Sequence, residues 1–225
     1  MDITCISDLH GYYPKLDGGD LLIVAGDLTA TDTHDQHIQF ALWLRDQKYK
    51  KKIVIAGNHD VSMQKNMLSD KTSEIPGMNC TYLCDSGTEF EGLKIWGSPW
   101  SLWFPGINPK CTAFTGNENK LMHEYEKIPT DIDILITHTP PYGILDKCRN
   151  GHVGSESLRQ QLFRIKPKLN VFGHIHECGG QIIDLVSSVC MNVSIVNERY
   201  EHVNKPVRII LNPQQSKVYD VDCNY

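Results

Sequence analysis

Short aliphatic runs separated by polar segments recur along the chain and predict buried strands. These runs lie at residues 2–6, 20–25, 52–56, 80–84, 88–90, 93–97, 132–137, 169–173, 181–185, 189–196, 207–212 and 216–221. Apolar residues at helical spacing instead predict helices over 34–48, 62–69, 117–127 and 156–164. Ser155, which precedes the last of these helices, is a preferred N-cap residue.

The order of these elements predicts an α/β fold (α+β in some schemes). Strands alternate with helices first and then follow one another, which favours a two-sheet β-sandwich flanked by helices. Residues 80–97 carry three strands with Gly87 and Gly92 at the turns, and we expect a β-meander there. The chain has 225 residues and no repeat or low-complexity tract, so we expect a single domain over residues 1–225.

Two local patterns carry further expectations. The helix over 34–48 should face a sheet with the stripe formed by Ile38, Ala41, Leu42 and Leu44. The one long irregular segment runs from Pro99 to Gly116 and contains Trp100 and Trp103. Long ordered loops often carry function, so this segment is a candidate rim of a site. Stacking of a nucleobase on the tryptophans is one interpretation, and packing of the loop onto the sandwich is the simpler one.

Five polar motifs follow the aliphatic runs in a fixed order. They are Asp8-Leu9-His10, Gly26-Asp27, Gly57-Asn58-His59-Asp60, His138 and Gly173-His174-Ile175-His176. In extended backbone, residues two apart point to the same side, which suits two ligands on one metal ion. Carboxylate, amide and imidazole groups at the ends of buried strands are the ligands that a two-metal hydrolytic centre requires.

Each motif alone also has a purely structural interpretation. Asp8 and His10 fit a plain turn, Asp27 fits a helix cap, and the segment from Gly57 to Asp60 fits an Asx turn. A single histidine such as His138 is more often a hydrogen-bonded residue than a ligand. Five such signals in one register make a metal centre the better interpretation. Within it, His59 would act as a proton donor, and Asp60 would fix the tautomer of its ring.

Composition and charge limit the kinds of molecule that the protein is expected to bind. The formal net charge of −5 and the sequence pI near 6.0 provide no basic field for a nucleic-acid duplex. Eight scattered cysteines, without a Cys-x-x-Cys pair, favour free thiols such as Cys5 and Cys190 over zinc or disulfides. No signal peptide and no apolar stretch of about 20 residues is recognised, so we expect a soluble, cytoplasmic protein without membrane partners.

Together the motifs resemble those of the calcineurin-like metallophosphoesterase superfamily. Segments such as Lys52–His59, Ile95–Trp100, Asp133–Pro141 and Pro167–Glu177 are similar to the MPPED branch, which is similar to class III cyclic-nucleotide phosphodiesterases. The resemblance implies a helix-flanked β-sandwich with two divalent metal ions at one edge. It implies one ion held by Asp8, His10, Asp27 and His176. The other would be held by Asp27, Asn58, His138 and His174, so that Asp27 bridges the pair.

This resemblance implies hydrolysis of small phosphodiesters, with 2′,3′-cyclic and 3′,5′-cyclic nucleotides as expected substrates, by a hydroxide that bridges the metal ions. Mn²⁺ is the expected cofactor, with Fe²⁺, Zn²⁺ and Co²⁺ as alternatives. Asn58 and His152 are the expected substrate contacts, the latter in a glycine-containing segment before a helix or, alternatively, in a capped loop. The sequence leaves open whether the protein forms oligomers.

Two alternative functions remain. The protein could be a phosphomonoesterase, such as a protein phosphatase, or a nuclease. The arginine that protein phosphatases carry soon after Gly-Asp is missing from Gly26–Asp32, and the chain leaves no room for the capping domain of related nucleases. It could also be a non-catalytic, metal-binding scaffold module, which would have no need of a complete ligand set.

Overall fold

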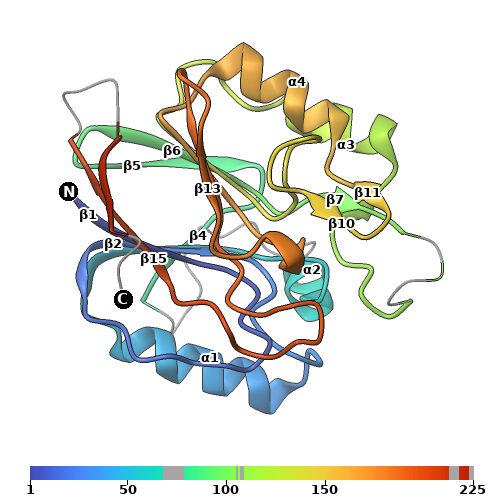
Figure 1. Cartoon of the computed structure of the whole chain (residues 1–225). Helices are drawn as coiled ribbons and strands as arrows, with labels where there is room; N and C mark the ends of the chain where they lie inside the picture. Colours follow the sequence, from blue (N-terminus) through green and yellow to red (C-terminus); the bar gives the residue numbers. More distant parts are fainter. Residues whose placement is uncertain (68–78, 105, 107–108, 213–217, 223–225) are drawn as a thin grey trace.

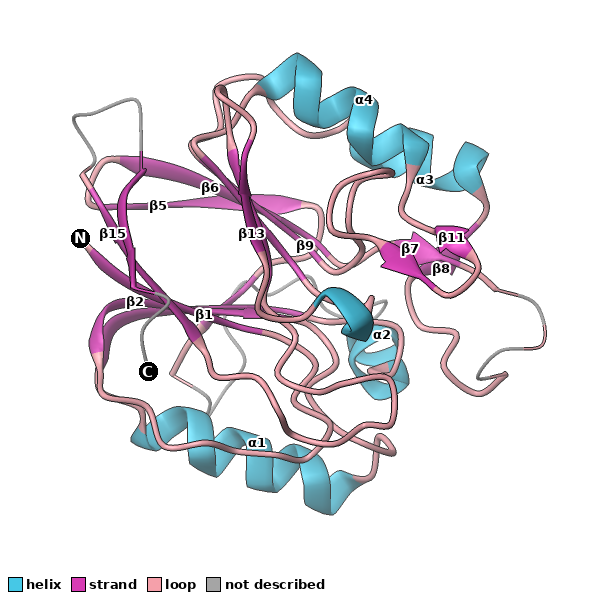
Figure 2. Ribbon diagram, viewed as in Figure 1, coloured by secondary structure: helices cyan, strands magenta, loops and turns pink. Residues whose placement is uncertain are grey.

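The computed structural model describes residues 1–67, 79–104, 106, 109–212 and 218–222 of the chain. In this part of the chain, two six-stranded sheets pack face to face, and helices cover their outer faces (Figures 1 and 2). The predicted two-sheet α/β sandwich with outer helices is confirmed.

The first sheet contains the N-terminal strands. Its order is β16 (Val218–Asp222), β15 (Val207–Leu211), β1 (Asp2–Ile6), β2 (Gly19–Ala25), β3 (Tyr49–Ile55) and β4 (Thr81–Tyr82). Strands β1 to β4 run parallel to one another. Strand β15 runs antiparallel to β1, and β16 runs antiparallel to β15. The carboxyl ends of β1, β2 and β3 therefore lie at one edge of the sheet.

The second sheet also contains four parallel strands, but its antiparallel strands lie one at each edge. Its order is β13 (Ile182–Asp184), β14 (Val189–Asn192), β12 (Leu169–Phe172), β9 (Ile134–Thr137), β6 (Leu93–Ser98) and β5 (Ser86–Phe90). The four inner strands are parallel and the two edge strands are antiparallel. The expected meander is wrong, because β4 belongs to the first sheet, whereas β5 and β6 form a hairpin in the second.

Two small ladders lie outside the sandwich. Strands β7 (Ser101–Leu102) and β8 (Thr115–Gly116) anchor the two ends of the long loop, and β10 (Lys147–Cys148) pairs with β11 (Gly151–His152). The short helix η1 (His176–Cys178) follows β12. None of the described helices is long and apolar enough to cross a membrane.

Aliphatic side chains from both sheets fill the space between them, among them Ile3, Ile23 and Ile53 of the first sheet and Ile134 and Val171 of the second. Successive residues of a strand point to opposite faces, so the alternate residues of the first sheet face outward. These include Leu22, Val24 and Val54, and they pack in one cluster with side chains of α1 (His34–Asp46).

Helix α1 covers the first sheet with only part of the predicted stripe, since Leu44 is buried and Ala41 packs against the same cluster, whereas Ile38 and Leu42 do not. Phe40 and Leu44 are its buried residues, whereas Ile38 and Leu42 are 46% and 45% exposed. Both pairs have the same i, i+4 spacing, and the sheet accepts the pair that contains the bulkier aromatic ring.

The remaining helices agree with the sequence to within one or two residues. Helix α2 (Val61–Met67) follows β3, and the expected continuation to residue 69 lies outside the described residues. Helices α3 (Glu118–Tyr125) and α4 (Glu156–Ile165) pack against Leu135 of the second sheet. The Ser155 hydroxyl accepts a hydrogen bond from the Leu158 N–H at 3.1 Å, which confirms the predicted cap.

The thiols of Cys5, Cys111, Cys148, Cys178 and Cys190 are free, and Cys5 and Cys190 are buried. Cys223 lies outside the described residues.

The two sheets meet at the edge where their parallel strands end. The Ser7 N–H donates to the Val193 carbonyl at 2.9 Å, and the Ile195 N–H donates to the Ser7 carbonyl at 3.1 Å. Gly173, after β12, lies so close to this junction that an added Cβ would be 2.1 Å from Asp8 Oδ2 and 2.2 Å from Ser7 Oγ. Only glycine permits this approach of the two sheets.

We therefore expect Gly173→Ala to lower the free energy of unfolding by about 1–3 kcal/mol through overpacking. Denaturant unfolding, followed by circular dichroism, measures this loss. The matched control is Gly87→Ala in β5, where the nearest atom to an added Cβ is the Ile95 carbonyl oxygen at 3.3 Å. Equal losses in the two variants would contradict the close approach at Gly173.

Candidate metal centre

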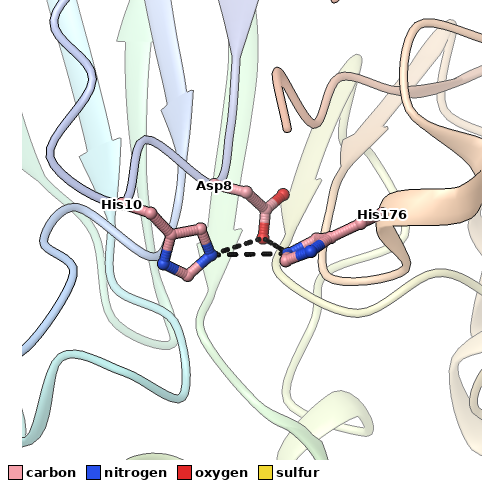
Figure 3. A group of neighbouring side chains, drawn as sticks. All are labelled: Asp8, His10 and His176. Atoms are coloured by element: carbon pink, nitrogen blue, oxygen red, sulfur yellow. Dashed lines mark hydrogen bonds and ion pairs between the residues drawn. The ribbon is translucent and has the colours of Figure 1, made fainter. Parts of the chain in front are cut away.

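Three side chains from opposite sheets form a first cluster (Figure 3). Asp8 and His10 follow β1, and His176 opens η1 after β12. His176 Nε2 lies 3.2 Å from Asp8 Oδ1 and 3.4 Å from His10 Nε2. One carboxylate oxygen and two imidazole nitrogens thus converge on one point, which is the arrangement of a metal-binding site.

A second cluster lies beside the first and contains Asp27, Asn58, His138 and His174. His138 Nε2 is 3.4 Å from Asp27 Oδ2 and 3.0 Å from Asn58 Oδ1. The rings of His138 and His174 lie 4.9 Å apart. His138 Nδ1 is 2.9 Å from the Ala25 carbonyl, which can only accept, so Nδ1 donates and Nε2 is left to face the cluster.

The Asp27 carboxylate connects the two clusters. Its Oδ2 atom lies 3.7 Å from His10 Nε2 in the first cluster and 3.4 Å from His138 Nε2 in the second. Its Oδ1 atom accepts a hydrogen bond from the His59 backbone N–H at 2.9 Å. Asp27 is therefore placed to share its charge between both clusters.

The backbone at the centre is held in a strained conformation. Asp8, His10, Asp27 and His174 have φ angles of +54°, +40°, +53° and +67°. This left-handed region is unfavourable for residues with a Cβ atom, and such residues gather at functional sites where the surrounding structure holds them in place. Here the Asp8 carboxylate helps to do so, because its Oδ2 atom accepts from the His174 N–H at 3.0 Å.

The two carboxylates are ionised and two of the imidazoles are neutral. Burial alone would raise the pKa of Asp8, but the hydrogen bond and charge of His176 outweigh it and hold the pKa below its usual range. His138 outweighs burial in the same way for Asp27 and lowers its pKa. Burial lowers the pKa of His10 to about 4 and that of His174 to about 3. Ionised carboxylates and neutral imidazoles are the forms that bind divalent metal ions.

The other two imidazoles compensate the buried negative charge. Burial alone would lower the pKa of His138, but Asp27 outweighs it and raises the pKa to about 9. The pKa of His176 is also raised, because its hydrogen bond with Asp8 outweighs burial. The protons on these rings take the place that metal cations would occupy, so the donor set fits divalent metal ions.

The His59 side chain lies beside the first cluster, but the Asp60 carboxylate points to backbone N–H groups elsewhere. His59 Nε2 is 3.9 Å from Asp27 Oδ2, and Nδ1 is 3.5 Å from the Cys111 thiol. The Asp60 carboxylate instead accepts from the backbone N–H groups of Gly57 at 2.8 Å and Leu28 at 3.1 Å. The structure thus corrects the expected His59–Asp60 pair: the carboxylate satisfies backbone donors of two loops.

His152 lies apart from both clusters, on the β10–β11 hairpin. Its Nδ1 atom is 2.5 Å from Asp146 Oδ1, and its side chain is 43% exposed. Asp146 is buried and also accepts from the Gly154 N–H. The Cys178 thiol of η1 donates to the Lys147 carbonyl at 3.5 Å, so the hairpin packs beside the element that carries His176.

Three residues near the clusters were not predicted from the sequence. Tyr200 packs against histidine rings of the first cluster, Phe104 stacks on His174, and Cys111 contacts His59. Phe104 and Cys111 lie in the long segment from Pro99 to Gly116, which the sequence marks as a candidate rim of a site, whereas Tyr200 lies in a turn without a recognisable motif. In the long loop, Trp100 packs through a hydrogen bond to Asp85, whereas Trp103 is 54% exposed.

Comparisons with known proteins agree with this architecture. The sequence profile of the calcineurin-like phosphoesterase family matches residues 1–178. The human metallophosphoesterase domain-containing protein 1 is 34% identical over 236 residues, covering 92% of this chain and 70% of that protein. A UPF0046 protein of Caenorhabditis elegans is 38% identical over 200 residues, covering 79% of this chain and 69% of that protein.

A solved structure shares the fold at low sequence identity. The protein TT1561 of Thermus thermophilus superposes with a TM-score of 0.62 at 14% identity, covering 86% of this chain and 90% of that chain. The fold, the family profile and the two relatives lead to one conclusion: the chain belongs to the calcineurin-like phosphoesterase family.

Proposed function

We propose that this protein is a phosphodiesterase that uses two divalent metal ions to hydrolyse small phosphodiesters, with 2′,3′-cyclic and 3′,5′-cyclic nucleotides as the substrate class. The observation that carries the proposal is the position of Asp27 Oδ2, within 3.7 Å of ligand atoms of both clusters. A shared carboxylate between two ligand sets is the arrangement that brings two ions close enough to act on one phosphate.

The residues divide into two ligand sets. Asp8, His10, Asp27 and His176 would hold one ion, and Asp27, Asn58, His138 and His174 would hold the other. Bound ions would polarise the phosphoryl oxygens and lower the pKa of water at the site. Mn²⁺ is our choice for supporting activity, because mixed Asp, Asn and His ligands accept Mn²⁺, Fe²⁺, Co²⁺ or Zn²⁺, and availability decides among them.

His59 is the candidate for moving a proton. Its side chain is 11% exposed and Nε2 points toward the Asp27 carboxylate, so it lies at the mouth of the centre beside the ligands. From there the ring can stabilise charge on the phosphate or donate a proton to the leaving oxygen. Asn58, between the strand end and His59, would contact both an ion and the substrate.

His152 is a candidate substrate contact at the rim. The hydrogen bond from Nδ1 to the buried Asp146 carboxylate leaves Nε2 as the outward atom of a half-exposed ring. Because Nδ1 donates to the carboxylate, Nε2 can accept a hydrogen bond there from a ribose hydroxyl of a substrate that reaches past η1. We also propose a cytoplasmic site of action, supported by the free thiols of Cys5 and Cys190, which suit a reducing compartment.

The alternatives have less support. A nuclease would use the same ions, but a net charge of −5 offers no basic field for a nucleic-acid duplex. Gly26–Asp32 also lacks the arginine that the resemblance leads us to expect in a protein phosphatase. A non-catalytic scaffold module would have no need of a complete set of ligands for two ions, and each proposed ligand residue is present in the two clusters.

Hydrolysis of bis-p-nitrophenyl phosphate tests the proposal directly. With added Mn²⁺, we expect turnover of this diester to exceed that of p-nitrophenyl phosphate, and to disappear with a chelator and in Asp27→Ala. Parallel assays of 2′,3′-cAMP and 3′,5′-cAMP then show which ring is opened. Protein that holds two ions and hydrolyses no ester would instead support the scaffold function.

The role of His59 is tested by His59→Ala. We expect both ions to remain bound, because none of the proposed ligands is removed, and kcat to fall roughly 10²–10⁴-fold. Metal content by mass spectrometry and steady-state kinetics measure the two effects. The matched control is His123→Ala on the exposed face of α3, which should leave both unchanged. Loss of metal together with activity in His59→Ala would make this residue a ligand instead.

Metal binding should depend on pH. Because the pKa of His138 is about 9 in the metal-free protein, its ring carries a proton at neutral pH that a metal ion must displace. Affinity should therefore rise by about tenfold per pH unit for each proton displaced, and level off above pH 9. Calorimetric titration with Mn²⁺ in two buffers of different ionisation enthalpy counts the released protons. Binding without proton release would contradict the protonated state of His138.

A further inference from the structure

Tyr200 packs against the first cluster, although it lies 24 residues after His176, the last residue of the motifs. Its ring centroid is 4.8 Å from that of His10 and 5.1 Å from that of His176, at interplanar angles of 78° and 87°. The His59 ring is 6.1 Å away. These edge-to-face contacts have the geometry that aromatic rings prefer, and they fix the tilt of both partners.

The orientation of the His10 ring depends on packing against aromatic rings, those of Tyr200 and of His59, whose centroid lies 4.6 Å from that of His10 at an interplanar angle of 75°. A ligating histidine normally donates its second ring nitrogen to a carboxylate or carbonyl, which sets the orientation of the imidazole. His138 does so through the Ala25 carbonyl. His10 Nδ1 is buried and has no hydrogen-bond partner in the described part of the chain, so ring packing must supply the orientation.

The turn that carries Tyr200 is built to hold it there. Asn197 Oδ1 accepts from the N–H groups of Arg199 and Glu201, and the Tyr200 N–H donates to the Asn197 carbonyl at 2.8 Å. Tyr200 itself has a φ angle of +60°, which is unfavourable for a bulky side chain. The turn keeps this strain and directs the ring toward His10 and His176.

We propose that Tyr200 is a positioning residue of the first metal site, whose ring holds the imidazoles of His10 and His176 in the orientation that binds the ion. The inference rests on the proposed two-metal function. It assigns the work to the aromatic ring and not to the hydroxyl group.

Metal binding by Tyr200 variants tests the inference without any substrate. Calorimetric titration with Mn²⁺ should show two binding events in the wild type, and His10→Ala identifies the one that belongs to the first site. In Tyr200→Ala we expect this event to weaken roughly 10–100-fold, as for other outer contacts of ligating histidines. Tyr200→Phe keeps the ring and should bind like the wild type.

Two controls separate positioning from general structure. Tyr12 is 41% exposed, follows His10 by two residues and packs against His202 at 5.5 Å, so Tyr12→Ala should bind Mn²⁺ like the wild type. Tyr200→Gly removes the ring at a position where glycine relieves the backbone strain. It should weaken the same binding event while the melting temperature of the metal-free protein stays unchanged or rises.

The outcomes are distinct from those of the proposed function. Unchanged Mn²⁺ affinity in Tyr200→Ala, equal weakening in Tyr12→Ala, or weakening in Tyr200→Phe would each overturn the role of the ring. A protein that binds two ions with this dependence on Tyr200, yet hydrolyses no diester, would refute the phosphodiesterase and leave the positioning role intact.

Discussion

Asp8, at the end of β1, accepts a hydrogen bond at 3.0 Å from the His174 N–H, which follows β12 in the other sheet. This contact joins the two sheets of the sandwich, and it sets two conditions on the surrounding chain. Residue 173 must lack a Cβ atom, because one would collide with the Asp8 carboxylate. Asp8 and His174 must both adopt positive φ angles. The second histidine of the motif, His176, is then delivered to Asp8 Oδ1.

Charge at this junction is balanced within the protein. Two buried carboxylates so close together would repel each other, and burying an unpaired charge is costly. His138 and His176, with raised pKa values, supply the compensating protons. A metal ion would supply the same charge more compactly, so ion binding and proton release are two sides of one equilibrium. The ligand side chains can therefore keep their positions when a metal ion replaces the protons on His138 and His176.

The structure brings the predicted ligand residues together because parallel strands of both sheets end at one edge. Each motif follows a buried run, so its place in the chain also determines its place in the fold. The same short runs carry no signal for which sheet a strand joins, which is why β4 and β5 were wrongly placed in one meander. Residues that act through packing, such as Tyr200, also escaped prediction. Their partners are distant in sequence, and a tyrosine in a polar turn has no distinctive neighbours.

Asp60 was expected to pair with the His59 ring, but its carboxylate is used by backbone hydrogen bonds. Its carboxylate follows His59 directly, but the N–H groups of Gly57 and Leu28 are buried donors that need an acceptor. Burial and the charge of Asp27 raise the pKa of Asp60 well above its usual range, so a second charge beside the centre is disfavoured. Asp60 therefore ties the loop after β2 to the loop after β3. This tie holds the two loops in the position where the His59 N–H donates to Asp27 Oδ1.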